Sequence, residues 1–258
     1  MNVKVRNIPG EGFVQRASVR LLAGALLLAF GAALGPPARG VPRSLAGEPL
    51  ATPKRRTPRK PKLKAANIRE AEQRLGELGY WTGRMDGVLD QGSRDALLAF
   101  QKVEGRTRTG RLNFNELEAL RSAASPRPFE AGPFHVEIDL ARQVLFIVDD
   151  AGKVSKILPV STGNNKEFET TVGILTAVTP RGRFKIQRKI DGWRESELGL
   201  MYYPSYIVGG IAIHGSKSVP AHPASHGCIR IPMHAAKQFS EMTPIGTPVI
   251  VHDGSARE

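Results

Sequence analysis

A single cysteine, Cys228, lies in the stretch Ser225-His226-Gly227-Cys228-Ile229-Arg230 of this 258-residue chain. Four of the six histidines lie within 14 residues of it: His214, His222, His226 and His234. A thiol attacks a carbonyl carbon only as its thiolate, and a neighbouring imidazole is a suitable base for producing that thiolate. The residue types in this stretch therefore predict a cysteine nucleophile with a histidine base.

The sequence has a candidate for each other part of such a site. His214 follows an apolar run, which predicts a rigid strand end for the base, and the carbonyl of Gly215 could fix the imidazole tautomer. The amides near Gly227 and Cys228 could bind the oxyanion, and Gly227 leaves room for a substrate carbonyl to approach. We expect Arg230 to add positive charge and to hold a substrate carboxylate.

Zinc binding is a competing interpretation, because Cys228, His226 and His214 could supply three ligands. The chain has no second cysteine to complete such a site. We expect no metal and no cofactor. We interpret three further histidines as ordinary loop or surface residues: His222, His234 and His252.

The N-terminus predicts export. Basic residues precede the apolar run Leu21–Leu34, whose 14 residues are fewer than the roughly 20 that span a bilayer. We interpret residues 1–40 as a signal peptide or a signal anchor, so the rest of the chain is expected in the cell wall or periplasm. A lone cysteine cannot form an internal disulfide, and in an exported protein it indicates a reactive thiol or intermolecular pairing.

The charge is concentrated in one segment. The formal net charge is +13, and the segment Lys54–Lys64 carries seven basic residues and no acid. Such a segment binds polyanions, and export makes nucleic acid an unexpected partner. We interpret residues 41–66 as a basic, proline-rich linker, which either rests on anionic wall polymer or membrane surface or is simply a solvated spacer.

Residues 67–124 show helical periodicity. One helix is predicted from Asn67 to the stop at Gly79, a second from about Ser93, and a third from Asn113. Three short helices in this length predict a small bundle, near the lower size limit for an independent fold.

This segment resembles the type 1 peptidoglycan-binding domain. The resemblance implies binding to cell-wall glycan, although the loop Arg106-Thr107-Arg108-Thr109-Gly110 departs from the usual Asp-Gly turn of that family. The matching positions are Leu75, Leu78-Gly79-Tyr80, Gly83, Asp86-Gly87-Val88, Ala96, Phe100-Gln101, Gly105 and Gly110.

Beyond a second linker, residues 125–133, the periodicity changes to two. We expect a mostly antiparallel β domain over residues 134–252 with one helix from Pro232 to about Met242, followed by a tail, 253–258. The predicted strands include 136–140, 144–148, 154–160, 207–213 and 249–251. The fold class predicted for the whole chain is α+β and multidomain.

The β domain resembles the catalytic domain of L,D-transpeptidases, the YkuD domain. The matching motifs are Ile213-His214-Gly215, Ser225-His226-Gly227-Cys228-Ile229-Arg230 and Thr179-Pro180-x-Gly182-x-Phe184-x-Ile186. The resemblance implies a β-sandwich-like fold with Cys228 as nucleophile and His214 as general base. It implies that His226, Gly227 and Arg230 shape the oxyanion and substrate site, supported by hydrogen bonds from Ser225.

The resemblance also implies a reaction. The thiolate attacks a peptidoglycan tetrapeptide stem, terminal D-Ala leaves, and an amine of a second stem takes the acyl group to form a 3-3 cross-link. Water as the acceptor would make the enzyme an L,D-carboxypeptidase. A non-catalytic peptidoglycan-binding scaffold is the alternative outside enzymes.

Aromatic residues gather just before the predicted base. Trp193, Tyr202, Tyr203 and Tyr206 lie in the segment 188–206. We hypothesise that this segment forms a flap over the thiol, with Trp193 and Tyr203 lining the stem-peptide groove. Ordinary core packing is the alternative for any single ring.

Overall fold

The computed structural model describes residues 62–171 and 173–254. The predicted signal segment and most of the basic linker, including Lys54–Lys60, lie outside the described residues. The described residues belong to one unit spanning Pro58–Glu258. Within this part of the chain, no helix has the length and apolar character needed to cross a membrane.

The first helix begins earlier than its sequence signal. Helix α1 (Ala65–Glu77) starts two residues before Asn67, with Lys64 as its N-cap. The Asn67 side chain sits at the third helical position and accepts a hydrogen bond from the Lys64 amide at 3.0 Å. Asn67 therefore caps the helix from inside its first turn, and Gly79 ends the segment with φ of 91°.

Two further helices have conventional N-caps. Helix α2 (Gln91–Val103) is capped by Asp90, which accepts a hydrogen bond from the Ser93 amide at 2.8 Å. Helix α3 (Phe114–Ser122) is capped by Asn113, as predicted. In both cases the cap carboxylate or amide oxygen satisfies an amide in the first turn that has no intrahelical partner.

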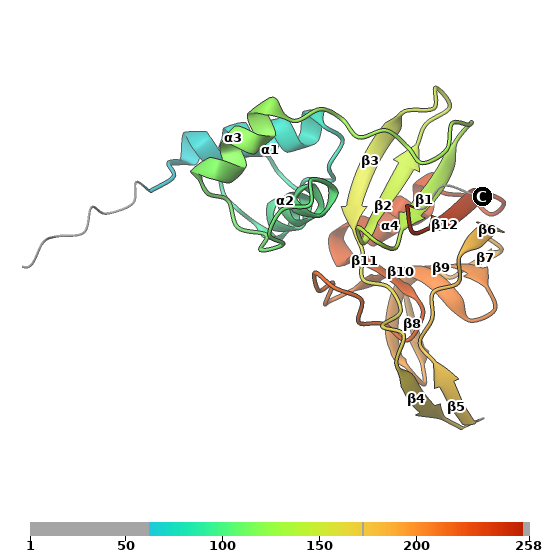
Figure 1. The fold of residues 1–258 in the computed structure, drawn as a ribbon. Coiled ribbons are helices and arrows are strands. Elements are labelled where there is room, and N and C mark those ends of the chain that lie inside the picture. The colour runs from blue at the N-terminus through green and yellow to red at the C-terminus, as the bar shows by residue number, and fades with distance from the viewer. Residues whose placement is uncertain (1–61, 172, 255–258) are drawn as a thin grey trace, which may run out of the picture. The chain divides into compact units, whose positions relative to one another are not determined.

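A five-stranded sheet opens the β domain, with the order β3-β2-β1-β12-β6. It contains β1 (His135–Asp139), β2 (Val144–Val148), β3 (Val154–Pro159), β6 (Gly182–Lys185) and β12 (Pro248–His252). Strands β1 and β12 are parallel, whereas the other neighbouring pairs are antiparallel. The predicted strands 136–140, 144–148, 154–160 and 249–251 are therefore present in this sheet, and Figure 1 shows β3, β2 and β1 side by side.

A second sheet has the order β11-β10-β9-β7, with β8 paired to β9. Its strands are β7 (Arg188–Lys189), β8 (Trp193–Ser196), β9 (Gly199–Val208), β10 (Ile211–Ser216) and β11 (Ile229–Pro232). Strands β10 and β11 run parallel to each other. Because these strands are parallel, their connection, residues 217–228, runs from the end of β10 back to the level of Ile213, where β11 begins.

One predicted strand is in fact two. The apolar run 207–213 contains the end of β9, a turn at Gly209-Gly210, and the start of β10. Gly209 has φ of 51°, a left-handed conformation that glycine adopts without the steric penalty of a side chain. The run was read as continuous because both strands are apolar, whereas the two glycines mark the reversal.

A small hairpin was missed by periodicity. It consists of β4 (Glu167–Thr170) and β5 (Gly173–Thr176), whose residues are largely exposed. Figure 1 shows this hairpin extending beyond the strands of the second sheet. The last helix, α4 (Met233–Met242), follows Pro232, which is its N-cap rather than its first helical residue.

The main core lies between the two sheets and α4. It contains Ile138, Ile147, Ile213, Ile229 and Phe239, all with no exposed surface. Burial of apolar side chains of this size is the main stabilising contribution, at roughly 1.5–3 kcal/mol for each.

A second core joins the helices to the first sheet. Leu75, Leu97 and Phe100 from the helices pack with Phe146 and Ile157 from β2 and β3. Alternate residues of a strand face opposite sides, so β2 is buried on both faces. The helical segment therefore shares a core with the β domain.

The predicted second linker is fixed to the β domain. Glu137 on β1 is fully buried and accepts hydrogen bonds from the amides of Phe129 and Glu130, both at 2.8 Å. The Phe129 ring stacks on His252 with centroids 4.0 Å apart. A buried carboxylate is stable only when its oxygens are hydrogen-bonded, and these amides meet that need.

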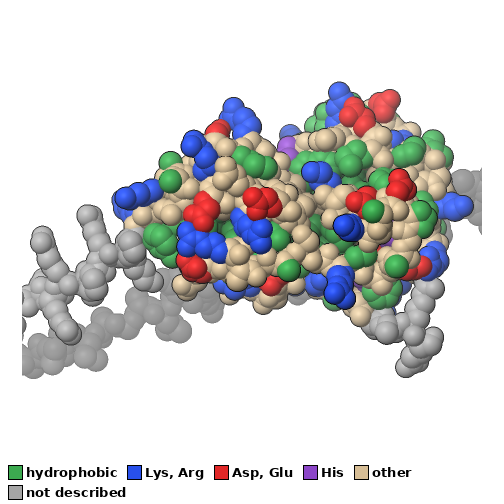
Figure 2. All heavy atoms as spheres, turned by 90° about the horizontal axis from the view of Figure 1, so that it is seen from above, with side chains coloured by type: hydrophobic (Ala, Val, Ile, Leu, Met, Phe, Trp, Pro, Cys, Tyr) green, Lys and Arg blue, Asp and Glu red, His purple; other side chains and the backbone are tan. Residues whose placement is uncertain are grey.

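The described surface mixes charges of both signs. On the face seen in Figure 2, Lys and Arg side chains are interspersed with Asp and Glu. The most strongly basic segment of the sequence, Lys54–Lys64, lies mostly outside the described residues.

Candidate active site

The strand pair β10 and β11 places the predicted catalytic residues on one face of the second sheet. In their register Ile213 pairs with Ile229, and His214 pairs with Arg230. Ile213 and Ile229 point into the core between the sheets. Because side chains alternate along a strand, His214, Arg230 and Cys228 face the other way. His214 and Cys228 are therefore diagonal neighbours on adjacent strands.

This face forms the floor of a cleft of about 860 Å³. The floor is lined by His214, Cys228 and Arg230, together with Ser225 and His226 from the loop before Cys228. The walls come from the two hairpins, β4–β5 and β8–β9: Phe168, Leu175, Thr176, Trp193, Arg194, Ser196–Met201.

His214 has the tautomer that a general base needs. Its Nδ1 lies 3.0 Å from the carbonyl oxygen of Gly215. A carbonyl only accepts hydrogen bonds, so Nδ1 carries the proton and Nε2 is left with a free lone pair. Burial lowers the pKa of His214, the bond to Gly215 opposes this shift, and the charge of Arg230 adds to it. The imidazole is therefore neutral at pH 7.

Cys228 lies against a small apolar cluster of Met201, Tyr206 and Ala212. Its Sγ lies 3.7 Å from the carbonyl oxygen of Gly210. Burial raises the pKa of the Cys228 thiol, whereas a hydrogen bond with the Ala212 backbone and the charge of Arg230 lower it. The resting pair is therefore a neutral thiol beside a neutral imidazole.

Ser225 holds the loop that carries the thiol. Its Oγ donates to the carbonyl oxygen of Cys228 at 2.6 Å and accepts from the amide of Gly227 at 3.0 Å. The Gly227 amide is thus occupied, which corrects the expectation that it helps to bind the oxyanion. The position predicted for Ser225, as a hydrogen-bonding support of the loop, agrees with these contacts.

Gly227 is required for a different reason. Its φ is 132°, and a Cβ atom there would lie 2.8 Å from Cδ1 of Ile211 and 2.9 Å from the carbonyl oxygen of Val178. Any side chain would meet both a strained backbone and close neighbours.

Thr179 is a part of the site that sequence reasoning did not assign a role. Its Oγ1 donates to the carbonyl oxygen of Gly227 at 2.6 Å and accepts from the Gly163 amide at 2.9 Å. The available signal was the motif Thr179-Pro180-x-Gly182, which was noted for its resemblance alone. The hydroxyl links two loops that are far apart in sequence.

The neighbouring histidines differ in their environments. His226 is exposed, and its ring lies 4.7 Å from that of Phe168. His234 lies 3.7 Å from a carboxylate oxygen of Asp95. Within residues 62–171 and 173–254, no group of three or more His, Cys, Asp or Glu side chains is arranged to hold a metal ion.

The two aromatic residues predicted to line the groove lie in different environments. Trp193 is 50% exposed and lines the cleft. Tyr203 does not reach it, because its ring packs against the core between the sheets and edge-on to Tyr202. Tyr203 has φ of 48°, so it interrupts the alternation of side chains along β9.

Comparisons with known proteins give matches for both the β domain and the helical domain. Residues 133–251 match the L,D-transpeptidase catalytic domain, YkuD, and residues 64–120 match the peptidoglycan-binding domain PG_binding_1. A crystal structure of the L,D-transpeptidase (residues 123–326) from Xylanimonas cellulosilytica DSM 15894 is 38% identical, with a TM-score of 0.68. The match covers 72% of this chain and 92% of that one. The chain belongs to the L,D-transpeptidase family.

Other solved L,D-transpeptidases are more distant. One from Stackebrandtia nassauensis is 22% identical over 72% of this chain and 90% of that chain, with a TM-score of 0.42. One from Mycobacterium smegmatis is 21% identical over 46% of this chain and 58% of that chain, with a TM-score of 0.37. A search of curated proteins found no matching sequence.

Family membership confirms the fold class and both resemblances drawn from the sequence motifs. As an L,D-transpeptidase with a peptidoglycan-binding domain, the chain has a peptidoglycan-modifying function, with peptidoglycan as its partner. Both domains indicate a cell-wall or periplasmic location.

Proposed function

We propose that the chain is an exported L,D-transpeptidase that cross-links peptidoglycan stem peptides through a thioester on Cys228. The observation that supports this most directly is the shared face of β10 and β11, where a half-buried thiol and a correctly tautomeric imidazole open into one cleft. The donor is a tetrapeptide stem cleaved between the L-centre of meso-diaminopimelate, or an equivalent residue, and terminal D-Ala.

Acylation starts from the neutral pair. Nε2 of His214 takes the proton of the Cys228 thiol as Sγ attacks the donor carbonyl carbon, and the carbonyl oxygen becomes an oxyanion. The tetrahedral intermediate collapses, the C–N bond to D-Ala breaks, and the imidazolium returns the proton to the leaving amine. The products are D-Ala and an acyl-enzyme thioester.

Deacylation uses the same groups in reverse order. An amine of a second stem attacks the thioester carbonyl while Nε2 of His214 accepts its proton. The C–S bond then breaks, a 3-3 amide bond remains, and the thiolate regains a proton from the imidazolium. Water in place of the amine would release a tripeptide, which is the L,D-carboxypeptidase outcome.

Two groups on the cleft floor complete the site. The amide of Cys228 is our candidate for the oxyanion donor, because the neighbouring Gly227 amide is already bonded to Ser225. Arg230 lies beside His214 in the strand register and lines the cleft, where its guanidinium can pair with a donor carboxylate. The same positive charge favours the thiolate over the thiol.

The β8–β9 hairpin is proposed as the flap over the bound stem. Trp193 and the turn around Leu198 line the cleft while remaining half exposed, at 50% and 49%. Exposed apolar residues on a cleft wall suit a covering role for an elongated ligand. The basic segment Lys54–Lys64 is proposed as a tether on anionic wall polymer or membrane surface.

The test is mass spectrometry of the purified enzyme incubated with a disaccharide-tetrapeptide. A dimer with a 3-3 link and free D-Ala supports transpeptidation, whereas a tripeptide without dimer supports hydrolysis. The Cys228→Ala variant should give neither product. Absence of any product from the folded wild-type protein would favour the non-catalytic scaffold.

A further inference from the structure

A lysine is buried where the helical segment meets the first sheet. Lys102 on α2 is 1% exposed, and its Nζ donates to the carbonyl oxygens of Gln143 at 3.1 Å and Val160 at 2.8 Å. Removing an amine from water is costly, so a buried lysine is retained where its donors fix particular acceptors. Both acceptors here belong to the β domain, although Lys102 belongs to the helical one.

Gln143, whose carbonyl oxygen accepts from Lys102, connects this lysine to Thr162. It is 1% exposed and has φ of 61°, an uncommon conformation for a residue with a side chain. Its Oε1 accepts from the Thr162 amide at 3.0 Å, and its Nε2 donates to Thr162 Oγ1 at 2.7 Å. Its backbone carbonyl, held by Lys102, also accepts from the Val160 amide at 2.9 Å. Lys102 therefore fixes the backbone of a residue whose side chain clamps Thr162.

Thr162 then contacts the nucleophile loop directly. Its carbonyl oxygen accepts from the amides of Ala224 at 3.0 Å and Ser225 at 2.9 Å. The preceding residue, Ser161, exchanges two backbone hydrogen bonds with Arg230, at 3.1 and 3.0 Å. Ser225 in turn holds the backbone of Gly227 and Cys228, so a series of hydrogen-bonded residues joins Lys102 to the backbone that carries the thiol.

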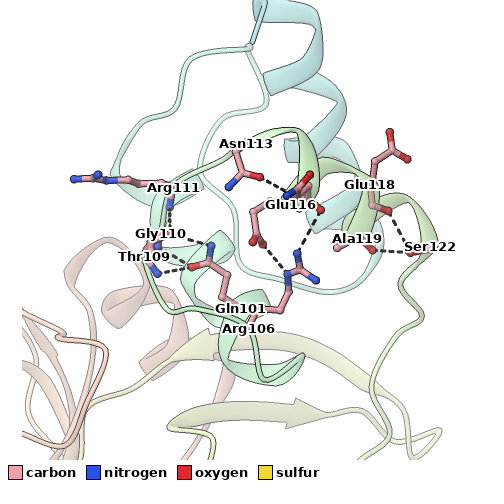
Figure 3. A network of polar contacts seen from close by, with 11 residues as sticks. Gln101, Arg106, Thr109, Gly110, Arg111, Asn113, Glu116, Glu118, Ala119 and Ser122 are labelled. Atoms are coloured by element: carbon pink, nitrogen blue, oxygen red, sulfur yellow. Dashed lines mark hydrogen bonds and ion pairs between the residues drawn. The ribbon is translucent and has the colours of Figure 1, made fainter. Parts of the chain in front are cut away.

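A second contact reaches the same region from the helical segment. Arg108 donates to the carbonyl oxygens of Ala221 at 3.2 Å and Ala141 at 3.4 Å. Figure 3 shows how its loop is held, with Gln101 bonded to the amides of Thr109 and Gly110. This is the loop whose sequence departs from the usual turn of the peptidoglycan-binding family, and here it contacts the segment that leads to the nucleophile.

We propose that Lys102 is a positioning residue for Cys228, acting through Gln143 and Thr162, so that the helical domain is a structural part of the active site. The proposal goes beyond wall binding by that domain. It rests on the proposed function only for its turnover readout, because the reactivity of the thiol can be measured without any substrate.

The test compares two variants of the full chain. Lys102→Met keeps a long apolar stem but removes the donors to Gln143 and Val160. The matched control is Arg74→Met: Arg74 joins α1 to α3 through the carbonyls of Leu120 at 3.0 Å and Ala123 at 2.7 Å, and has no contact with the Gln143 series. The control therefore weakens the helical domain without touching the path to the thiol.

The readouts are the iodoacetamide alkylation rate of Cys228, followed by intact mass, and the split between kcat and KM. We expect Lys102→Met to change the alkylation rate by about tenfold and to lower kcat by about tenfold with little change in KM. Arg74→Met should stay within about twofold of wild type at a matched reduction in Tm. Wild-type thiol reactivity in folded Lys102→Met, or equal effects from both variants, would overturn the proposal.

A further variant covers the case in which Lys102→Met does not fold. Thr162→Val removes the hydroxyl that accepts from Gln143 while preserving side-chain shape, and should change alkylation about threefold in the same direction. An unchanged rate in Thr162→Val would then count against the proposal. If the thiol responds as expected but no variant or wild type turns over a stem peptide, the proposed function fails and the positioning role stands.

Discussion

Cys228, the proposed nucleophile of this L,D-transpeptidase, lies between two regions of opposite character. Toward the helical domain its loop is supported by polar groups that are buried and hydrogen-bonded, from Ser225 back to Lys102. Toward the cleft, the two hairpins expose large apolar residues, including Ile174 at 66% and Leu200 at 56%. The comparison indicates that the rigid side holds the reacting groups, whereas the exposed side is available for substrate.

The largest expected effect concerns the base. His214→Gln should slow formation of the thioester about 10²- to 10⁴-fold, because it removes the proton acceptor while the cleft remains. The rate is measured by intact mass of the acyl-enzyme. His222→Gln is the matched control, since His222 is exposed and does not line the cleft. Equal losses in both variants would contradict the assignment of His214 as the base.

A second prediction tests the buried lysine through stability. Burial lowers the pKa of Lys102 to about 7, with the nearby Arg108 charge in the same direction and Asp95 opposing it. Between about pH 7 and pH 10.5 the unfolded chain holds a proton that the folded chain lacks, so stability rises with pH. The free energy of unfolding of wild type should therefore rise relative to Lys102→Met by up to about 1.4 kcal/mol per pH unit.

Urea unfolding of both proteins at several pH values checks this difference, because titration of all other groups cancels in the comparison. Below about pH 7 the folded chain also holds this proton, so the destabilisation of wild type relative to Lys102→Met should reach its full size and stop changing with pH. A constant difference across the whole range would mean that Lys102 titrates normally in the folded protein.

A third prediction concerns the resting state of the thiol. Since burial raises the pKa of Cys228 above its usual value of 9.0, alkylation of the free enzyme should still be increasing with pH near pH 9. The charge of Arg230 lowers that pKa, so Arg230→Gln should slow alkylation at pH 8 by about threefold. A plateau in the wild-type rate below pH 7 would instead reveal a preformed thiolate–imidazolium pair.

The smallest expected effects separate the two aromatic residues. Trp193→Ala should raise KM for the stem peptide about threefold with Tm unchanged, because its ring is exposed in the cleft. Tyr203→Ala should cost about 1–3 kcal/mol of stability, because its ring packs on the main core. Thermal melts and steady-state kinetics of both variants distinguish these roles. A raised KM with unchanged Tm in Tyr203→Ala would instead indicate that Tyr203 lines the groove.

Much of the fold and the pairing of Cys228 with His214 could be predicted from local sequence. Helix ends and strand faces depend mainly on neighbouring residues. Alternation of polar and apolar residues predicted β1, the apolar run 144–148 predicted β2, and the cap at Asn113 predicted α3. The motif residues Cys228 and His214 were paired across 14 positions because a base needs a rigid strand end, and the register now places them on one face. The position of Tyr203 could not be predicted from its place in the aromatic cluster, because a single left-handed residue reverses the alternation along β9.

What the sequence did not show depends on contacts between distant segments. Lys102 reads as a solvated helix residue, since burial of its amine follows only from packing α2 against β2 and β3. Thr179 likewise shows its role only once the loops at Gly163 and Gly227 meet. Sequence periodicity predicts which face of a helix or strand is buried. The roles of Lys102 and Thr179 depend instead on which distant segments pack against each other.

Because the helices and the first sheet share a core, the two domains cannot be exchanged between proteins independently of each other. Val144, Phe146 and Ile157 are fully buried against the helices, so a catalytic domain released at residue 133 would present this apolar strip to water. A helical domain taken from another protein would restore solubility only if its α2 matched these side chains and supplied an amine for Gln143. In this chain, recombination must therefore preserve an interface and cannot treat the wall-binding segment as an interchangeable module.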